Sequence, residues 1–258
     1  MSTPRADAGF ALLLVLWALV PVSLLFLMLA GASRSDARLA INLRGAAELE
    51  AVADGAIHTA IFELLQPAGA PGGSGSPGVA VEVASLSGLV HPNVASPELR
   101  RALMVRLGAD PGRAGRVAAA VADWRAPGLS PRPDGANAPQ YRAAGLGYGP
   151  PGAPFETLGE LRDVLGMSDG LLAALMPHLT LHWDGEPDPR AAGLVVAAAL
   201  RDLGVAGAAG RPSARAVRIT ATARRPDGAS ATRRAVIRFG PTERRGWRVL
   251  AWDTWQGA

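Results

Sequence analysis

The chain has 258 residues, of which 49% are hydrophobic, and a formal net charge of +4. This length allows one large domain or two modest ones with a buried core, and the apolar content argues against wholesale disorder. Cysteine is absent, which excludes disulfides and thiolate metal sites. All 26 basic residues are arginine, but a net charge this small does not identify a partner.

The first feature along the chain is an uncharged apolar run over residues 10–30. As an α-helix it would be about 31 Å long, which is enough to cross the hydrocarbon core of a bilayer. Pro21 lies in mid-span, where transmembrane helices tolerate proline. A cleaved secretory signal is the alternative, because residues 30–32 (Ala-Gly-Ala) offer a small-x-small cut, but the run exceeds the usual signal core. We therefore predict a transmembrane helix over residues 10–31.

The segment after this span has the pattern of an amphipathic helix. Residues 34–65 contain no proline, and the two interior glycines, Gly45 and Gly55, each weaken a helix by about 1 kcal/mol. Apolar residues recur at spacings of three and four, which places them on one stripe. The stripe consists of Leu39, Leu43, Ala46, Leu49, Ala53, Ile57, Ala60, Ile61 and Leu64. We predict that residues 32–65 continue the membrane helix without a break; a short joint and a separate core-packing helix would show the same stripe.

The middle of the chain is mainly helical in pattern. Gly, Pro and Ser in residues 66–78 predict a flexible connection, and the alternation that follows predicts a strand over 79–85. Pattern and capping signals, including a capping box from Thr157 to Glu160, favour helices over several segments. These segments are 96–124, which holds two helices, then 157–166, 168–177 and 189–203. The segment 125–155 has almost no periodicity, and a loop of this length is expected to be functional or braced by a metal.

The end of the chain has the pattern of an antiparallel sheet. Two alternating segments flank a turn at Pro226-Asp227-Gly228, which predicts a hairpin, and residues 245–255 predict a third strand. Arginines interleaved with apolar residues indicate a sheet with one face in water. The predicted fold is therefore α+β. It has a long N-terminal transmembrane and amphipathic helix, and an antiparallel sheet interrupted after its first strand by a large all-helical insertion.

The N-terminal sequence DAGFALLLVLWALV resembles the start of type IV pilin-like proteins. In such proteins a prepilin peptidase cuts after the leader's glycine, which here implies cleavage between Gly9 and Phe10 and N-methylation of Phe10. Most members carry Glu as the fifth mature residue, where this chain has Leu14. The K-type minor pseudopilin of type II secretion (the general secretion pathway protein K family) lacks that Glu. Leu14 is therefore interpreted as the marker of a tip subunit.

Later segments resemble the same family in the same order. They are the turn from Gly88 to Asn93, the segment 155–182 and the strands over 214–239. The resemblance implies a leader (1–9), a pilin-like sheet domain (66–87 and 206–258) and an inserted helical domain (88–205).

The resemblance also implies a role. It places the chain in the inner membrane as a single-pass protein with its C-terminal domain in the periplasm. There it would start or cap the type II secretion pseudopilus, with I- and J-type minor pseudopilins, the major pseudopilin and the prepilin peptidase as partners. It implies no enzyme activity and no nucleic-acid partner. The arginines Arg34, Arg38 and Arg44 after the span outnumber Arg5 before it, which favours the reverse orientation; a peptidase site facing the cytoplasm overrides this.

Relatives in this family bind calcium in the helical domain, near an Asp-Trp-x-Asp pattern followed by Gly-Ala-Glu-x-x-Tyr. This chain has Asp123 and Asp134, but Ala126 stands in place of the second Asp of the pattern and Asn137 stands in place of its Glu. Calcium takes six to eight oxygen ligands, several of them charged. We therefore expect a weakened or lost calcium site at Asp123, Asp134 and Asn137, and no other cofactor.

Two other functions have weaker support in the sequence. Residues 161–176 have the rhythm of a helix-hairpin-helix module, and the arginine-rich C-terminal strands could bind phosphates. A membrane-anchored nucleic-acid-binding protein is thus the alternative function. His178 and His182 share the i, i+4 spacing of metal ligands on a helix, but the helix breaks at Pro177 and the residues between the two histidines are strand-like. No nucleophile–base pair is visible, so a secreted hydrolase has no site.

Overall fold

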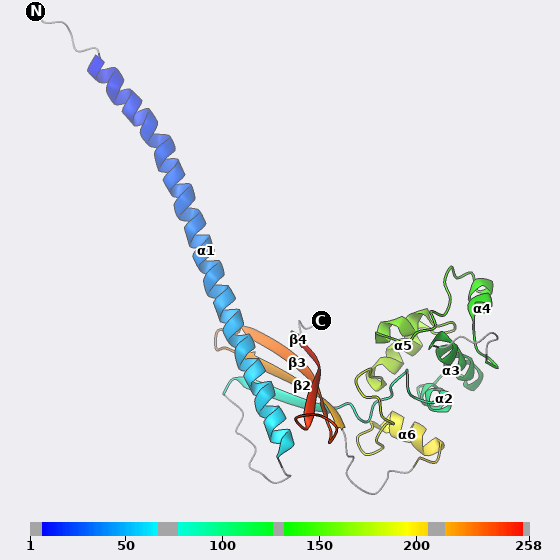
Figure 1. Ribbon diagram of the computed structural model, residues 1–258. Helices are drawn as coiled ribbons and strands as arrows, with labels where there is room; N and C mark the ends of the chain where they lie inside the picture. The colour runs from blue at the N-terminus through cyan, green and yellow to red at the C-terminus, as the bar shows by residue number, and fades with distance from the viewer. Residues whose placement is uncertain (1–6, 67–76, 126–131, 206–214, 255–258) are drawn as a thin grey trace, which may run out of the picture.

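The computed structural model describes the backbone of residues 7–66, 77–125, 132–205 and 215–254. Within the first helix it describes the side chains of residues 13–25 and 39–65. One long helix leads into a four-stranded sheet, and a group of short helices lies on the other side of that sheet from the free end of the long helix (Figure 1). The structure is a mixed α+β fold with an antiparallel sheet, as predicted.

The N-terminal helix α1 (Asp7–Leu65) is continuous over 59 residues and passes through Pro21 without a break. At 1.5 Å per residue it is about 90 Å long, and only its C-terminal part lies against the sheet (Figure 1). The unbroken continuation from 10–31 into 32–65 is confirmed at the level of the backbone. The alternative prediction, two separate helices linked by a short joint, is wrong.

The transmembrane character of this helix stays a prediction. Among the side chains that the structure describes, no helix is both long and apolar enough to cross a membrane. The side chains of residues 10–12 and 26–31 in the predicted span, and residues 1–6 of the predicted leader, lie outside what the structure describes.

The sheet consists of β1 (Val79–Ser85), β2 (Arg215–Arg224), β3 (Ser230–Phe239) and β4 (Trp247–Thr254), in that order and all antiparallel. The strand predicted before the helices thus pairs with the first strand after them, with Val83 opposite Ile219. The predicted hairpin turn lies between β2 and β3. There Gly228 has a φ of 90°, and the backbone N–H of Ala229 donates to Asp227 Oδ1 at 3.0 Å.

A core joins α1 to one face of the sheet. Its helix side contains Ile57 and Ala53, both fully buried, and its sheet side contains Ile219 and Ile237. Alanines on both elements let the helix approach the strands closely, and burying a side chain such as Ile57 stabilises the fold by about 2–3 kcal/mol. The other members of this core are Leu49, Ala60, Ile61, Val217, Ala221, Ala223, Ala235 and Phe239.

The helices between β1 and β2 form their own core. They are α2 (Pro97–Arg106), α3 (Pro111–Arg125), α4 (Ala138–Ala143), η1 (Leu158–Asp163), α5 (Asp169–Leu175), η2 (Met176–His178) and α6 (Leu194–Asp202). Buried side chains from α2, α3 and α6 meet there, among them Leu103, Val117 and Val196. Helix α2 begins at the predicted place because Ser96 Oγ accepts the N–H of Leu99 at 3.1 Å.

Three predicted elements differ from the structure. The segment 125–155 contains helix α4, which is capped at Asn137 and was missed because it is only six residues long. The predicted helix over 157–166 is the 3₁₀ helix η1, although its capping box is present: the N–H of Thr157 donates to Glu160 Oε1 at 2.7 Å. The predicted helix over 189–203 begins only at Leu194. Because η1 is not an α-helix, this region does not form a helix-hairpin-helix module.

Candidate functional site

The exposed part of α1 is a candidate assembly surface. Its described residues near the N-terminus are apolar and largely exposed; Leu14, for example, is 58% exposed and Trp17 is 78% exposed. Of the predicted stripe, Leu39 and Leu43 are also exposed, and the N-terminal part of α1 extends past the sheet (Figure 1). The stripe therefore divides: its second half packs inside the chain, and its first half has apolar side chains available to another molecule.

A polar cluster ties α1 to the sheet beside this surface. Asp54 Oδ1 accepts Nε of Arg233 at 2.8 Å and Nε1 of Trp252 at 3.0 Å. The Trp252 ring lies 5.1 Å from the ring of His58, one turn further along α1. Glu50 is a weaker partner, at 3.8 Å from Arg233. The cluster therefore links α1 to β3 and β4.

A second contact holds the C-terminal end of α1. Arg215 Nη2 donates to the carbonyl oxygen of Leu64 at 2.6 Å, and its guanidinium lies 5.1 Å from the centre of the Phe239 ring. The last carbonyls of a helix lack partners within the helix and carry partial negative charge. No basic residue lies in the last turn of α1 itself, so this arginine from β2 supplies the positive cap.

In the loop predicted to bind calcium, the buried carboxylate of Asp123 is paired with an arginine. Asp123 in α3 is completely buried, and it forms an ion pair with the guanidinium of Arg132. Its other oxygen, Oδ2, accepts the backbone N–H of Arg132 at 3.1 Å. A Cβ at Gly135 would lie 2.0 Å from the same oxygen. Each oxygen of Asp123 thus has a partner in Arg132, and Gly135 packs closely against Oδ2.

The other two predicted ligands do not complete a calcium site. Asp134 is exposed and has a φ of 62°, and the buried Asn137 caps helix α4. Calcium takes six to eight oxygens, several of them charged, whereas here a guanidinium already occupies the one buried carboxylate. Within the described part of this loop, these three side chains therefore do not form a ligand set that fits a calcium ion. Sequence reasoning missed Arg132, since no local pattern pairs an arginine in a Pro-rich loop with a helical aspartate nine positions earlier.

His178 and His182 do not form a metal site together. His178 ends η2, and His182 lies in the following turn, where burial lowers its pKa. Within the described ranges no three His, Asp or Glu side chains are placed to hold a metal ion. His182 instead lines a groove together with His91 and Arg218.

The turn from Gly88 to Asn93 links the parts of the helical block. A Cβ at Gly88 would lie 2.2 Å from the backbone of Ala191, so only glycine fits there. The Asn93 side chain bonds the backbone of Phe155 twice: its Nδ2 donates to the carbonyl at 2.9 Å, and its Oδ1 accepts the N–H at 2.9 Å. The N–H of Asn93 also donates to His91 Nδ1 at 3.0 Å. The turn singled out in the sequence is thus a structural joint.

The family model of type II secretion system protein K matches residues 82–184, which include the joint at Asn93, the Asp123 loop and helices α2 to α5. Residues 82–184 belong to the protein K family. The family resemblance seen in the sequence is therefore confirmed over the helical block. A search of curated proteins gives no match.

Among solved structures, the fold is similar to one from enterotoxigenic Escherichia coli. That structure is described as the crystal structure of the GspK–GspI–GspJ complex of the type 2 secretion system. The TM-score is 0.55 at 17% sequence identity, and the match covers 87% of this chain and 99% of the other. The similarity in fold thus extends beyond the matched family segment to most of the chain.

Proposed function

We propose that this chain is a minor pseudopilin at the tip of the periplasmic pseudopilus of a type II secretion system. It starts or caps assembly of the pseudopilus for protein export across the outer membrane. The observation that carries the proposal is the protein K family match over residues 82–184. The long helix projecting from the sheet, with exposed apolar side chains such as Leu39 and Leu43, supports it. The role is structural, and no catalytic residue is assigned.

The partners in this proposal are I- and J-type minor pseudopilins and the major pseudopilin. The similar fold comes from a chain set crystallised as a GspK–GspI–GspJ complex, which supports this choice. The test is co-expression with the I- and J-type pseudopilins of the same genome, followed by purification through a tag on this chain. We expect one stable complex of all three, and loss of secretion when this gene is deleted. Full secretion in the deletion strain would contradict the proposal.

The N-terminus is proposed to anchor the chain in the inner membrane, with the sheet and helical block in the periplasm. In this scheme the prepilin peptidase cuts between Gly9 and Phe10, and Phe10 is then methylated. Mass spectrometry of the chain expressed with the peptidase should give N-methyl-Phe10 as the first residue. Gly9→Val should block the cut, and the neighbouring control Ala8→Ser should not. An intact leader in the unmodified chain would contradict this part of the proposal.

Leu14 fits a subunit with no neighbour above it. In pilins of this type a carboxylate at this position is thought to pair with the N-terminal amine of an adjacent subunit, and an unpaired carboxylate in hydrocarbon is costly. A tip subunit has no such partner, so leucine removes the cost. This role for Leu14 is part of the proposal.

We also propose that the helical block is stable without calcium. The positive charge beside Asp123 comes from Arg132, whose guanidinium and backbone N–H use both carboxylate oxygens. An arginine fixed by the chain gives permanent neutralisation of a buried carboxylate, whereas a metal gives it only when bound. In this proposal the protein has no metal cofactor.

A further inference from the structure

The sheet has two edge strands, and only one of them is protected against pairing with another chain. The ladder between β3 and β4 contains a register shift, and β4 carries the charged residues Arg248 and Asp253. Bulges and charges are common devices that keep an edge strand from adding a further strand. β1 is regular: all of Val79–Ser85 is in register with β2, and Glu82 is its one charged residue. The β1 edge is therefore the one suited to accept a strand.

The backbone of β1 presents every second residue to this edge. In an antiparallel pair, opposite residues alternate between pairs that are joined by hydrogen bonds and pairs that are not. Just before β1, the N–H of Arg224 donates to the carbonyl oxygen of Gly78, and just after it the N–H of Leu86 donates to that of Ala216, both at 2.8 Å. Both bonds have the same phase, so the even-numbered residues of β1 bond to β2 and the odd-numbered ones point their N–H and C=O groups outward. The outward residues are Val79, Val81, Val83 and Ser85. Among the described residues, no backbone hydrogen bond outside the strand ladder includes them.

The same valines have exposed apolar side chains. Val81 is 41% exposed and Val83 is 45% exposed, although their opposite residues in β2, Ala221 and Ile219, are fully buried. Opposite residues lie on one face of a sheet, so these valines are on the face that packs against α1. The core beneath α1 ends at β1, where Val79 is only partly buried. A further strand beside β1 would cover the valines and extend this core.

Glu82 determines the charge that suits such a strand. Its exposed side chain lies on the other face of the sheet, opposite Thr220, and the arginine in the same row, Arg234, is two strands away. No ion pair among the described residues includes Glu82. Opposite charges directly across a pair of strands stabilise it, whereas like charges destabilise it. A lysine or arginine therefore suits the position opposite Glu82.

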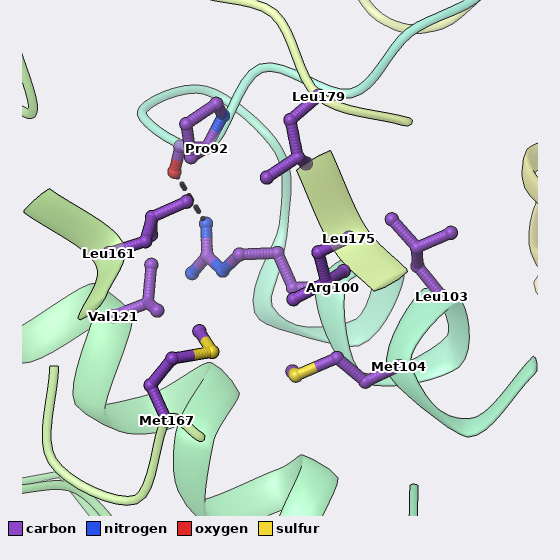
Figure 2. A pocket seen from close by; sticks show the side chains of 9 residues that line it. All are labelled: Pro92, Arg100, Leu103, Met104, Val121, Leu161, Met167, Leu175 and Leu179. Carbon is purple, nitrogen blue, oxygen red and sulfur yellow. Dashed lines mark hydrogen bonds between the residues drawn. The ribbon is translucent and has the colours of Figure 1, made fainter. Parts of the chain in front are cut away.

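The interior of the helical block has no room for a partner of this kind. Figure 2 shows Arg100 among apolar side chains of the block, with its Nη1 donating to the carbonyl oxygen of Pro92 at 3.1 Å. The space between these side chains is about 20 Å³, which is about the room of one water molecule. A peptide segment cannot enter there, whereas the β1 edge is on the surface.

We propose that the β1 edge binds an extended segment of another protein as a fifth, antiparallel strand. The backbone of this segment pairs with the outward N–H and C=O groups of Val81 and Val83. Its apolar residues alternate with polar ones and lie beside these valines, and it has a basic residue opposite Glu82. The binding depends only on the sheet, so it is independent of the proposed role in secretion.

The test measures binding of a fluorescein-labelled peptide, Val-Thr-Val-Arg-Val-Thr-Val, to the full chain in detergent. Fluorescence anisotropy should show saturable binding. In the free chain the N–H groups of Val81 and Val83 should exchange with solvent faster than those of Ala80 and Glu82, and the peptide should slow them. N-methylation of the valines that flank the arginine should abolish binding, because their N–H groups donate to β1. N-methylation of the arginine should be tolerated, because its N–H points away from β1.

Variants of β1 separate strand addition from general adhesion of an apolar peptide. Val81→Pro removes an outward N–H and leaves the ladder with β2 intact, and edge strands tolerate proline at such positions. It should weaken binding at least about tenfold. The control Val81→Thr keeps the N–H and the β-branched shape, and it should bind nearly as well as the unmodified chain. Independently, Glu82→Arg should weaken binding about two- to fivefold, and a peptide with glutamate in place of arginine should restore it.

Three results would overturn the proposal. The first is equal peptide affinity in Val81→Pro, checked for folding by circular dichroism, and in the unmodified chain. The second is slow exchange of the Val81 and Val83 N–H groups in the absence of peptide, because the edge would then already be covered. The third is self-association in analytical ultracentrifugation that Val81→Pro abolishes, because the edge would then bind a second copy of this chain.

Discussion

The contact between α1 and the sheet gives the sharpest prediction. Asp54→Ala removes an acceptor that receives two hydrogen bonds, from Arg233 at 2.8 Å and Trp252 at 3.0 Å. Charge-assisted hydrogen bonds contribute about 1.5–3 kcal/mol when buried, but exposed ion pairs contribute only about 0.2–1 kcal/mol. The Asp54 side chain is 31% exposed and that of Arg233 is 17% exposed. We therefore expect the free energy of unfolding to fall by about 2 kcal/mol.

Chemical unfolding of the full chain in detergent, followed by tryptophan fluorescence, measures this change directly. For a chain of this size about 2 kcal/mol corresponds to a fall in Tm of roughly 4–8 °C. Glu50→Ala is the matched control, because Glu50 lies 3.8 Å from the same arginine and is 42% exposed; it should cost about 0.5 kcal/mol or less. Asp54→Asn, which keeps an acceptor for Trp252, should fall between the two. Equal losses for Asp54→Ala and Glu50→Ala would contradict this prediction.

Two further predictions concern the helical block. Millimolar calcium or a chelator should leave Tm unchanged, whereas Arg132→Gln should cost about 3 kcal/mol because it leaves the carboxylate of Asp123 buried without its cation; a large calcium-induced rise in Tm would contradict both. For His91, burial lowers the pKa below its usual value of 6.5, although Asp184 opposes this. As pH falls, His91 is therefore protonated in the unfolded chain before it is protonated in the folded chain. The contribution of neutral His91 to the free energy of unfolding is complete above about pH 6.5 and declines below it. Melting at pH 7.5 and 5.5 should show a smaller loss in His91→Gln than in the unmodified chain, and identical losses would contradict the prediction.

Local sequence patterns determined most of the elements. Proline and serine at Ser96 and Pro97 fixed the start of α2, the Asp-Gly turn fixed the β2–β3 hairpin, and alternation fixed the strands, because these signals act between near neighbours in the chain. Short elements were less predictable. Helix α4 is too brief to show periodicity, and η1 was predicted as an α-helix although it forms the tighter 3₁₀ geometry.

The spacing of the apolar stripe on α1 could not predict which part of the stripe is buried within this chain. Its spacing predicted one apolar face along residues 39–64, and the spacing is the same at both ends. Only the position of the sheet decides that Ile57 is fully buried while Leu43 is 62% exposed. A periodic pattern records that a face is apolar, but whether the partner lies in the same chain or in another subunit depends on tertiary structure.

The sequence alone was enough to predict most helices and strands in their order and the resemblance to the protein K family, now matched over residues 82–184, while the span and the leader at the N-terminus stay predictions. The tertiary structure alone decided the ionic pairs. It placed Arg132 on Asp123 and Arg233 on Asp54. The reason is physical: hydrogen bonds within a helix or turn join residues a few positions apart, whereas a charge can be neutralised by any group that folding brings within reach.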